Sequence, residues 1–335
     1  MNQADSNTKS IRLATAFSGI GAVETAMGLL DLKNEIVFAG DIDEFCKETY
    51  FANYKINEEK WHSDVRKFDA TQYKDNVDIF VGGSPCQSFS VMGKRKGLDE
   101  ARGTLFYEFA RIISECNPKV FIYENVTGML NHDNGNTWNV IKNIFDELNY
   151  LWTYWVLNAK DFGLPQNRNR IFVVGFQKEL SKYFKKLKQP SIIPLKSSVE
   201  DFLDDYVPNK YYLPIKGFLR VTNPKESKHI ALNHKVSRCQ VACQQYNWFG
   251  DMRFESHIPE RIENDKRIHK GIFNGVRGVT RTLTPRECLR LMGFPNSFNI
   301  VVNDTQVYRQ SGNSIAVNVI AQVVQSIVNT GIFHE

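Results

Sequence analysis

Short apolar runs alternate with amphipathic stretches through the first half of the chain, and this alternation limits the possible folds more than any other feature. Five runs are predicted to form strands, at residues 11–17, 35–39, 77–81, 120–123 and 171–176. Helices are predicted at residues 23–32, 43–53, 105–116 and 139–148. Strands and helices in this order typically form a mostly parallel sheet with helices on both faces. We therefore predict an α/β fold.

Polar clusters follow four of these strands at the points where the strands end. The clusters are Ser18-Gly19-Ile20-Gly21, Asp41-Ile42-Asp43, Ser84-Pro85-Cys86-Gln87 and Glu124-Asn125-Val126. Because the carboxyl ends of parallel strands meet at one edge of a sheet, we expect these side chains to converge there. This edge is the predicted functional site.

The character of the sequence changes after residue 176. A lysine-rich stretch at 178–189 and a break at 190–194 precede a polar, aromatic and irregular region from 211 to 277. This change indicates a second domain. The predicted domains are a first domain over 1–180, a second domain over 181–279, and a return to the first domain over 280–335.

The final segment contains two helix signals. The sequence Thr284-Pro285-Arg286-Glu287 is typical of a helix start. Residues 314–329 are apolar at helical spacing and contain too many valines and isoleucines for a surface helix. We expect this last helix to pack against the first domain.

Composition excludes few functions. The 335 residues carry a formal net charge of +5, which suits a polyanionic partner but is shared by many other enzymes. The chain has no signal-peptide core and no apolar stretch near the ~18 residues of a membrane span, so no membrane association is predicted. Six scattered cysteines favour reduced thiols over a disulfide framework. The expected location is the cytoplasm.

The glycine turn and Asp41 together indicate a nucleoside-containing cofactor. Backbone N–H groups at a helix start bind a phosphate or carboxylate, and a carboxylate at a strand end accepts hydrogen bonds from a ribose diol. The turn lacks the full G-x-G-x-x-G spacing, so a purely structural turn stays open as an alternative. Asp43 would serve equally well as a helix N-cap.

Cys86 lies in a turn where a thiol is presented rather than packed. Pro85 fixes its own φ and favours an extended Ser84, which gives the thiol a defined direction. The alternative is a cysteine buried as a small hydrophobe. Glu124 ends an apolar strand, a costly place for a charge unless it is paired or functional, although helix capping would also explain it.

Basic residues lie on both sides of these clusters. Arg168 and Arg170 directly precede the strand at 171–176, beside the same edge. The loop Gly93-Lys94-Arg95-Lys96-Gly97 is typical of a lid that closes over a phosphate backbone, or of a solvated loop. Cys239 and Cys243 match no common zinc spacing, so no metal is predicted.

Six motifs taken together resemble the bacterial cytosine-5 DNA methyltransferases of the restriction-modification type. They are Phe17-Ser18-Gly19-Ile20-Gly21, Gly83-Ser84-Pro85-Cys86-Gln87, Glu124-Asn125-Val126, Gln166-Asn167-Arg168-Asn169-Arg170, Arg281 to Cys288 with Gly293-Phe294-Pro295, and Gly312-Asn313-Ser314. The motifs keep the family's usual order and span nearly the whole chain. The resemblance implies the S-adenosylmethionine-dependent methyltransferase fold, which is Rossmann-like, with a smaller, irregular target-recognition domain.

The resemblance also implies a reaction. Cys86 would add as a thiolate to carbon 6 of a cytosine, which makes carbon 5 nucleophilic. Glu124 would bond ring N3 and the exocyclic amine, Arg170 would bind the carbonyl oxygen, and Arg168 would support the same pocket. The methyl donor would be S-adenosyl-L-methionine, with S-adenosyl-L-homocysteine as the product.

By the same resemblance, the cofactor would contact residues from several motifs. Phe17, Gly19 and Gly21 would form its turn, with Asp41 on the ribose and Ile42 against the adenine. The remaining predicted contacts are Asp64 and Val65 near the adenine amino group, and Asn313 and Ser314 by the methionine end. The chain departs from the family at Thr15, where an acid is common, and at Ile42, where an aromatic residue is common.

Double-stranded DNA is the predicted substrate, and its target base must flip out of the stack for carbon 6 to be reached. The residues expected to close over the DNA are Gln87, Ser90, Lys94, Arg95 and Lys96. Side chains of the types that read base edges are Arg238, Gln240, Gln244, Gln245, Asn247 and Arg253. Their spacing does not indicate a target sequence.

The most economical interpretation is a monomeric, nucleoid-associated modification enzyme, whose cognate restriction endonuclease is a functional rather than a physical partner. Methylation of cytosine in transfer RNA is one alternative, and a catalytically silent DNA-binding regulator is another. A nicotinamide-dependent dehydrogenase would explain the glycine turn and Asp41, but it gives no role to Cys86 with the two arginines.

Overall fold

The computed structural model describes residues 10–85 and 105–334. These residues form two compact units. The first contains the described residues up to 158, residues 169–192 and the chain from 315 onward, and the second contains residues 159–168 and 193–314. Each unit is described by itself.

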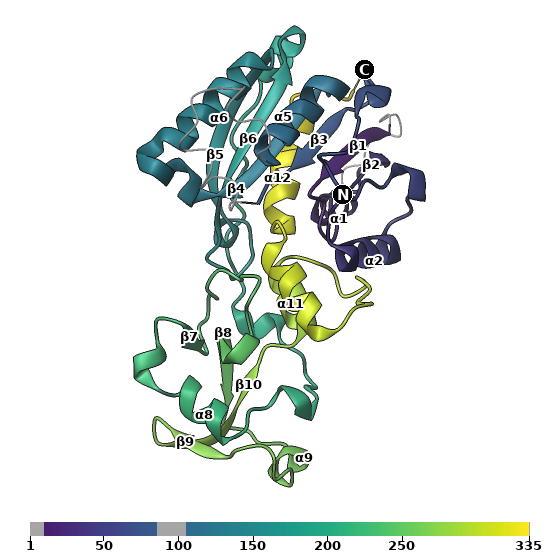
Figure 1. The fold of residues 1–335 in the computed structure, drawn as a ribbon. Coiled ribbons are helices and arrows are strands. Elements are labelled where there is room, and N and C mark those ends of the chain that lie inside the picture. Colours follow the sequence, from purple (N-terminus) through teal and green to yellow (C-terminus); the bar gives the residue numbers. More distant parts are fainter. Residues whose placement is uncertain (1–9, 86–104, 335) are drawn as a thin grey trace. The chain divides into compact units, whose positions relative to one another are not determined.

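The first unit is built on a six-stranded, mostly parallel sheet (Figure 1). Its strands are β1 (Ile11–Ala16), β2 (Asn34–Phe38), β3 (Ile79–Gly82), β4 (Val120–Val126), β5 (Tyr150–Asn158) and β6 (Asn169–Gln177). Their order across the sheet is β2-β1-β3-β4-β6-β5, and only β6 runs antiparallel to its neighbours β4 and β5. The five predicted strands are confirmed. The sequence does not predict β5, a half-exposed edge strand whose burial does not alternate regularly.

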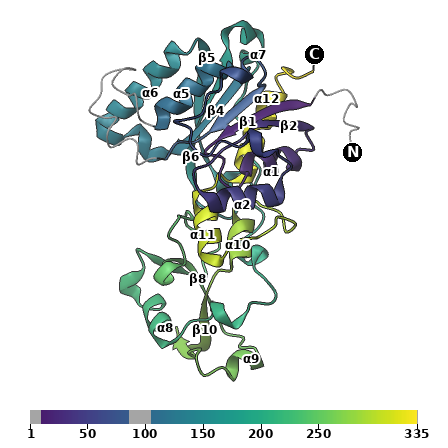
Figure 2. The same ribbon diagram turned by 45° about the vertical axis from the view of Figure 1, so that its right-hand side comes forward.

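Helices cover both faces of this sheet, as predicted (Figures 1 and 2). They are α1 (Ala22–Leu29), α2 (Glu44–Asn53), α5 (Leu105–Cys116), α6 (Asn136–Glu147), the short α7 (Ser181–Phe184) and α12 (Val317–Val328). On one face, aromatic side chains of α5 and α6 pack against the strands. Phe145 of α6 stacks on Phe121 of β4, with ring centroids 5.2 Å apart. The apolar helix α12 packs against α1, which confirms that the C-terminal helix returns to the first unit.

The second unit contains a smaller sheet that the sequence does not predict. Its strands are β7 (Ile230–Leu232), β8 (Gly250–Glu255), β9 (Gly271–Phe273) and β10 (Val276–Thr282), in the order β7-β8-β10-β9. Its helices are α8 (Ile215–Val221), α9 (Glu260–Glu263), α10 (Pro285–Leu291) and α11 (Asp304–Asn313). Two of the strands have only three residues, too few for a recognisable alternation of apolar and polar positions.

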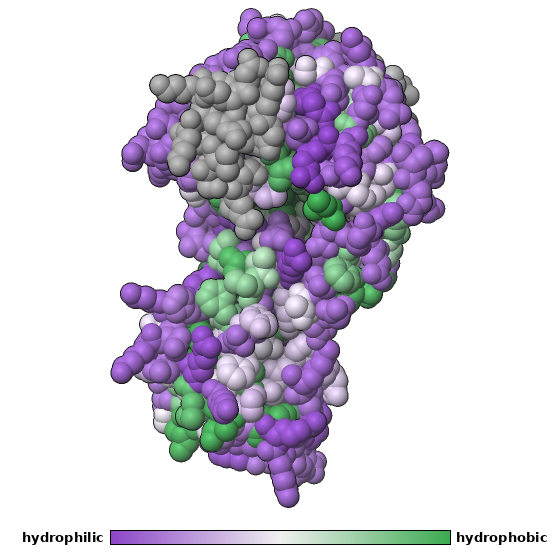
Figure 3. Space-filling view, viewed as in Figure 1, coloured by the Kyte–Doolittle hydropathy of each residue, from purple (hydrophilic) through white to green (hydrophobic). Residues whose placement is uncertain are grey.

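On the face shown in Figure 3, most of the coloured surface is hydrophilic and the hydrophobic areas are scattered. Within the described ranges, no helix is both long enough and apolar enough to cross a membrane.

The boundaries of the two units differ from the predicted domains. Residues 280–314, expected in the first domain, belong to the second unit, because β10 lies inside its sheet. Residues 159–168 also belong to it, since Ser237 donates its backbone N–H to the Pro165 carbonyl at 2.8 Å. The first unit continues to residue 192 rather than 180.

A buried ion pair joins β10 to α10 in the second unit. The side chain of Arg281 is 1% exposed and that of Glu287 is fully buried, with Nη1 and Oε2 2.8 Å apart. Arg281 also pairs with Glu255 on β8. Glu287 completes a capping box with Thr284, which confirms the predicted helix start. One guanidinium therefore connects two strands and a helix.

Replacing Arg281 with methionine should destabilise the protein strongly, because the carboxylate of Glu287 would be left buried without its cation. The expected loss in free energy of unfolding is about 3–5 kcal/mol, measured by urea denaturation. The control is Arg277→Met, which breaks an ion pair with Glu263 whose side chains are 58% and 42% exposed. That loss should stay below about 1 kcal/mol. Equal losses in the two variants would contradict the stabilising role of the buried ion pair between Arg281 and Glu287.

Candidate active site

The loop after β1 turns through three residues with positive φ angles. Phe17, Gly19 and Gly21 have φ values of 55°, 54° and 80°. A Cβ at Gly21 would lie 2.1 Å from the ring of Tyr54, whose hydroxyl donates to the Gly21 carbonyl at 2.6 Å. A Cβ at Gly19 would meet no described atom within 4 Å, so the turn is open on that side. Gly21 is the N-cap of α1, and the turn therefore leads directly into a helix start.

Asp41 is held beside this turn by backbone amides. Its Oδ2 accepts from Gly19 N at 2.9 Å, and its Oδ1 accepts from Asp43 N at 3.0 Å. Asp43 caps α2, as expected, by accepting from Phe45 N. The next side chain, Ile42, is 68% exposed.

This arrangement fits the adenosine part of S-adenosylmethionine. A carboxylate has about four acceptor positions, so Asp41 can hold the turn and accept from ribose hydroxyls. The exposed face of Ile42 offers an apolar surface for a purine ring. Phe17, Gly19, Asp41 and Ile42 are therefore the residues of the first unit that would hold the cofactor.

Asp64 and Val65, also predicted near the cofactor, have different environments. Asp64 pairs with Arg66 at 2.9 Å, and the hydrogen bond from Arg66 lowers the pKa of the Asp64 carboxyl. The Val65 side chain is buried in the core, and its carbonyl accepts from Arg111 at 2.7 Å. The structure therefore uses the Val65 side chain for packing.

Glu124 and Arg170 form an ion pair at the carboxyl end of β4. Their Oε1 and Nε atoms are 3.1 Å apart, and the two side chains are 12% and 16% exposed. In the β4–β6 ladder Arg170 lies opposite Val126, two residues from Glu124 on the same face. Diagonal neighbours on one face of a sheet are within reach of long side chains. The two groups that the sequence predicts for one pocket are thus brought together.

Asn125 bonds the segment before Cys86 to the end of β4, a contact that the sequence does not predict. Its Nδ2 donates to the Ser84 carbonyl at 2.8 Å and to the Tyr123 hydroxyl at 2.8 Å. A Cβ at Gly83 would lie 2.8 Å from the Glu124 carbonyl oxygen. A glycine and an amide therefore hold the segment before Cys86 against the end of β4.

Six predicted residues lie outside the described part of the chain. They are Cys86, Gln87, Ser90, Lys94, Arg95 and Lys96. Two other cysteines are poor nucleophiles, because burial raises the pKa of the Cys116 thiol to about 12 and that of Cys288 well above its usual value.

Arg168 binds three backbone carbonyls of the second unit. Its guanidinium donates to the carbonyls of Gln240 at 2.8 Å, Gly312 at 3.1 Å and Ser314 at 2.6 Å, and the residue is 3% exposed. Bonds to backbone carbonyls are compatible with the supporting role that the resemblance implies for Arg168. Of the two predicted cofactor contacts at the end of α11, Asn313 is exposed and Ser314 is buried.

Four of the six predicted base-reading residues are buried in the second unit. They are Gln240, Gln244, Gln245 and Arg253, each 4–7% exposed. Gln244 bonds Gln240 Oε1 at 2.9 Å and Ser311 Oγ at 2.8 Å, and Arg253 bonds Glu200 at 2.7 Å. Base reading requires side chains at the surface, so these contacts favour a structural role.

The remaining two base-reading candidates are not fully buried. Arg238 is half-buried and donates to the Lys228 carbonyl at 2.9 Å, whereas Asn247 is exposed. Asn247 has a φ of 47° in a turn where Gln245 and Trp248 also have positive φ values.

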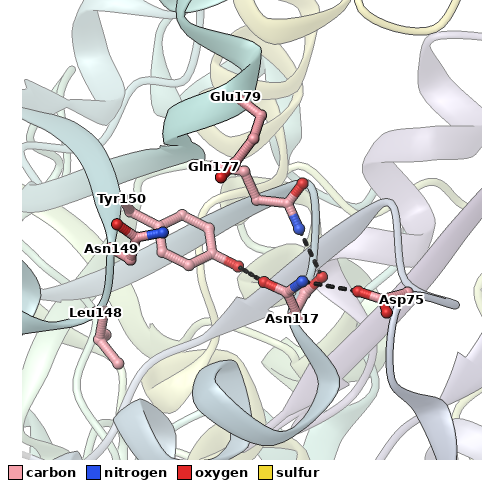
Figure 4. A pocket seen from close by; sticks show the side chains of 7 residues that line it. All are labelled: Asp75, Asn117, Leu148, Asn149, Tyr150, Gln177 and Glu179. Carbon is pink, nitrogen blue, oxygen red and sulfur yellow. Dashed lines mark hydrogen bonds between the residues drawn. The ribbon is translucent and has the colours of Figure 1, made fainter.

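A cavity lies at the opposite edge of the first unit's sheet (Figure 4). Its lining residues are Asp75, Asn117, Leu148, Asn149, Tyr150, Gln177 and Glu179. Asn117, just before β4, donates to Asp75 Oδ1 at 2.7 Å and accepts from Gln177 Nε2 at 2.9 Å through its carbonyl. These bonds tie strand ends together, and none of the predicted site residues lines the cavity. In the described ranges, no three His, Cys, Asp or Glu side chains are grouped to hold a metal.

Sequence comparison gives the family. The profile of the C-5 cytosine-specific DNA methylases matches residues 11–329. The chain is 38% identical over 323 residues to the type II methyltransferase M.SsoII of Shigella sonnei, covering 95% of this chain and 80% of that protein. It is 32% identical over 335 residues to the type II methyltransferase M.HhaI of Haemophilus parahaemolyticus, covering 96% of both proteins.

Solved structures give the same fold. The Entamoeba histolytica methyltransferase EhMeth matches with a TM-score of 0.73 at 19% identity, over 96% of this chain and 98% of that one. Spodoptera frugiperda DNMT2, solved as a triple mutant, matches with a TM-score of 0.72 at 23% identity, over 95% and 100%. The family profile and the sequence relatives show that the chain belongs to the C-5 cytosine-specific DNA methylases, which transfer a methyl group from S-adenosylmethionine to carbon 5 of cytosine in DNA.

Proposed function

We propose that this protein is the modification methyltransferase of a restriction-modification system, acting as a monomer on a cytosine within a defined sequence of double-stranded DNA. Two relatives at 38% and 32% identity are named type II methyltransferases, which supports the modification role. The family profile is one of DNA methylases and favours DNA over the transfer RNA alternative. The partner endonuclease would cleave the same sequence when it is unmethylated. Methylation by this protein would block that cleavage without any binding between the two proteins.

The observation that carries the site assignment is the ion pair between Glu124 and Arg170. A carboxyl and a guanidinium 3.1 Å apart can bond two neighbouring polar edges of one pyrimidine ring. Glu124 would hold ring N3 and the exocyclic amine, and Arg170 would hold the carbonyl oxygen. The segment that leads to Cys86 is bonded to the same end of β4 through Asn125.

Cys86 would act as the nucleophile on this ring. Its thiolate forms a bond to carbon 6, and the electron pair of the 5,6 double bond shifts toward carbon 5. Glu124 stabilises the charge that develops at N3, and carbon 5 becomes nucleophilic. When bound, S-adenosylmethionine supplies the methyl group. Loss of the carbon 5 proton to a water or hydroxide base then expels the Cys86 thiolate and restores the double bond.

Base flipping is required because a stacked duplex hides carbon 6, and it costs a few kcal/mol. The loop residues Gln87, Ser90, Lys94, Arg95 and Lys96 would close on the phosphate backbone and stabilise the opened duplex. In the second unit, Asn247 is the better candidate for a DNA contact than the buried glutamines, because its side chain is exposed.

Replacing Cys86 with serine should abolish methyl transfer, because a hydroxyl is a far weaker nucleophile than a thiolate. DNA binding should remain measurable in a gel-shift assay. The wild-type protein should also form a covalent adduct with a duplex that carries 5-fluorocytosine, since no proton can leave carbon 5, and the variant should not. Near wild-type turnover by the variant, or no adduct with the wild type when cofactor is present, would refute the role of Cys86.

Glu124→Gln should lower kcat by about 10²–10⁴-fold, because an amide cannot supply the proton or the charge at ring N3. The matched control is Glu108→Gln. Glu108 also pairs with an arginine, Arg111, at 2.7 Å, and its side chain is likewise 12% exposed. Single-turnover methylation assays should show activity within twofold of wild type for the control. Equal effects in the two variants would indicate a structural role for Glu124.

When the protein is expressed in cells that have no other cytosine methylation, it should methylate cytosine within one short DNA sequence. Bisulfite sequencing of their DNA is expected to show methylated cytosine at nearly every copy of that sequence and at few other positions. Methylation spread over unrelated sequences would contradict the modification role, and methylation confined to RNA would support the alternative substrate.

A further inference from the structure

A chain of hydrogen bonds lies beneath the glycine turn of the first unit. The backbone N–H of Gly40 donates to Ser18 Oγ at 2.9 Å, and Ser18 Oγ lies 2.7 Å from Thr15 Oγ1. Thr15 Oγ1 donates to Glu24 Oε1 at 3.1 Å. Tyr50 of α2 donates to the same oxygen at 2.7 Å. These hydrogen bonds thus connect the end of β2 through the turn to α1 and α2.

The acceptor at one end, Glu24, determines which group donates in each of these hydrogen bonds. Each hydroxyl has one proton to donate. Because Thr15 donates its proton to Glu24, Ser18 must donate to Thr15, and Ser18 can then accept from Gly40. An acceptor at position 24 therefore orients both hydroxyls.

Glu24 lies in the first turn of α1, and its burial is unusual for a carboxyl group. It is 6% exposed, and its Oε2 atom is buried without a hydrogen-bond partner among the described residues. Burial raises the pKa of the Glu24 carboxyl, which favours the neutral acid, and Oε1 accepts hydrogen bonds in either protonation state. A buried polar group of this kind is costly and persists only with a compensating role.

The bonds fix a strained segment. Phe17 has a φ of 55°, which is unfavourable for a residue other than glycine and needs support from its surroundings. Thr15 and Ser18 stand on either side of Phe17, and Ser18 N also donates to the Gly40 carbonyl at 2.9 Å. The same loop presents Gly19 N to Asp41. Loss of these hydrogen bonds would release the turn and the Asp41 carboxylate together.

We propose that Thr15 and Glu24 are positioning residues for the methyl-donor site: Glu24 on α1 is the buried acceptor that locks the Phe17–Gly21 turn and the Asp41 carboxylate in their binding geometry. Thr15 lies near the end of β1, and the Glu24 carboxyl reaches its hydroxyl from α1. The inference rests on the proposed placement of S-adenosylmethionine beside Asp41.

The test compares cofactor binding by Thr15→Val and Thr280→Val. Both threonines are buried, but the hydroxyl of Thr280 has no hydrogen-bond partner among the described residues. Thr15→Val should raise the Kd for S-adenosylmethionine about tenfold in calorimetry, equivalent to ~1.4 kcal/mol, whereas Thr280→Val should leave it unchanged. The KM for the cofactor should rise with the Kd, and the Kd for DNA should not change.

Two further variants separate positioning from general packing. Glu24→Gln keeps an acceptor oxygen and should bind the cofactor like wild type, whereas Glu24→Leu should lose affinity as Thr15→Val does. Unchanged affinity in Thr15→Val would overturn the inference, as would a loss in Glu24→Gln as large as that in Glu24→Leu. If Glu24→Leu does not fold, Thr15→Val decides alone.

Asp41→Ala distinguishes failure of the inference from failure of the cofactor site. A loss of affinity in Asp41→Ala without one in Thr15→Val would leave the cofactor placement intact and refute only the positioning role. No loss in either variant would refute the placement beside Asp41 as well.

Discussion

The antiparallel pairing of β6 with β4 is the constraint on which the proposed active site depends. An antiparallel strand begins at the edge where its parallel neighbours end, so the first residues of β6 reach the carboxyl end of β4. The register sets Arg170 opposite Val126 and therefore diagonal to Glu124 on one face. A parallel strand at this position would begin at the opposite edge and carry Arg170 away from Glu124.

In the second unit, buried polar side chains connect the short elements beside several small apolar clusters. Arg281 holds β8, β10 and α10 together through two carboxylates. Gln240 and Gln244 bond backbone and side-chain groups of α10 and α11, which anchors the loop that bears the exposed Asn247. Buried amides and ion pairs of this kind need several partners at once, and they specify one arrangement of short strands that have little propensity of their own.

Local signals predict much of the first unit and little of the second. Residues 11–17, 105–116 and the helix start at Thr284 follow from periodicity and capping, which act over a few residues. The edge strand β5 and the small sheet lack such a pattern. The place of residues 159–168 in the second unit also escapes prediction, because it depends on contacts such as that of Ser237 with Pro165, far apart along the chain.

The sequence by itself determined the order of strands, helices and motifs, and hence that a glycine turn, an acid and a Cys-containing turn follow parallel strands at one edge. Only the tertiary structure decided which polar side chains are paired or buried: Glu124 with Arg170, Thr15 with Glu24, and Gln244 with Ser311. The reason is physical. Strand and helix periodicity is a local property of the chain, whereas the burial of a polar group depends on partners that the fold brings from distant positions.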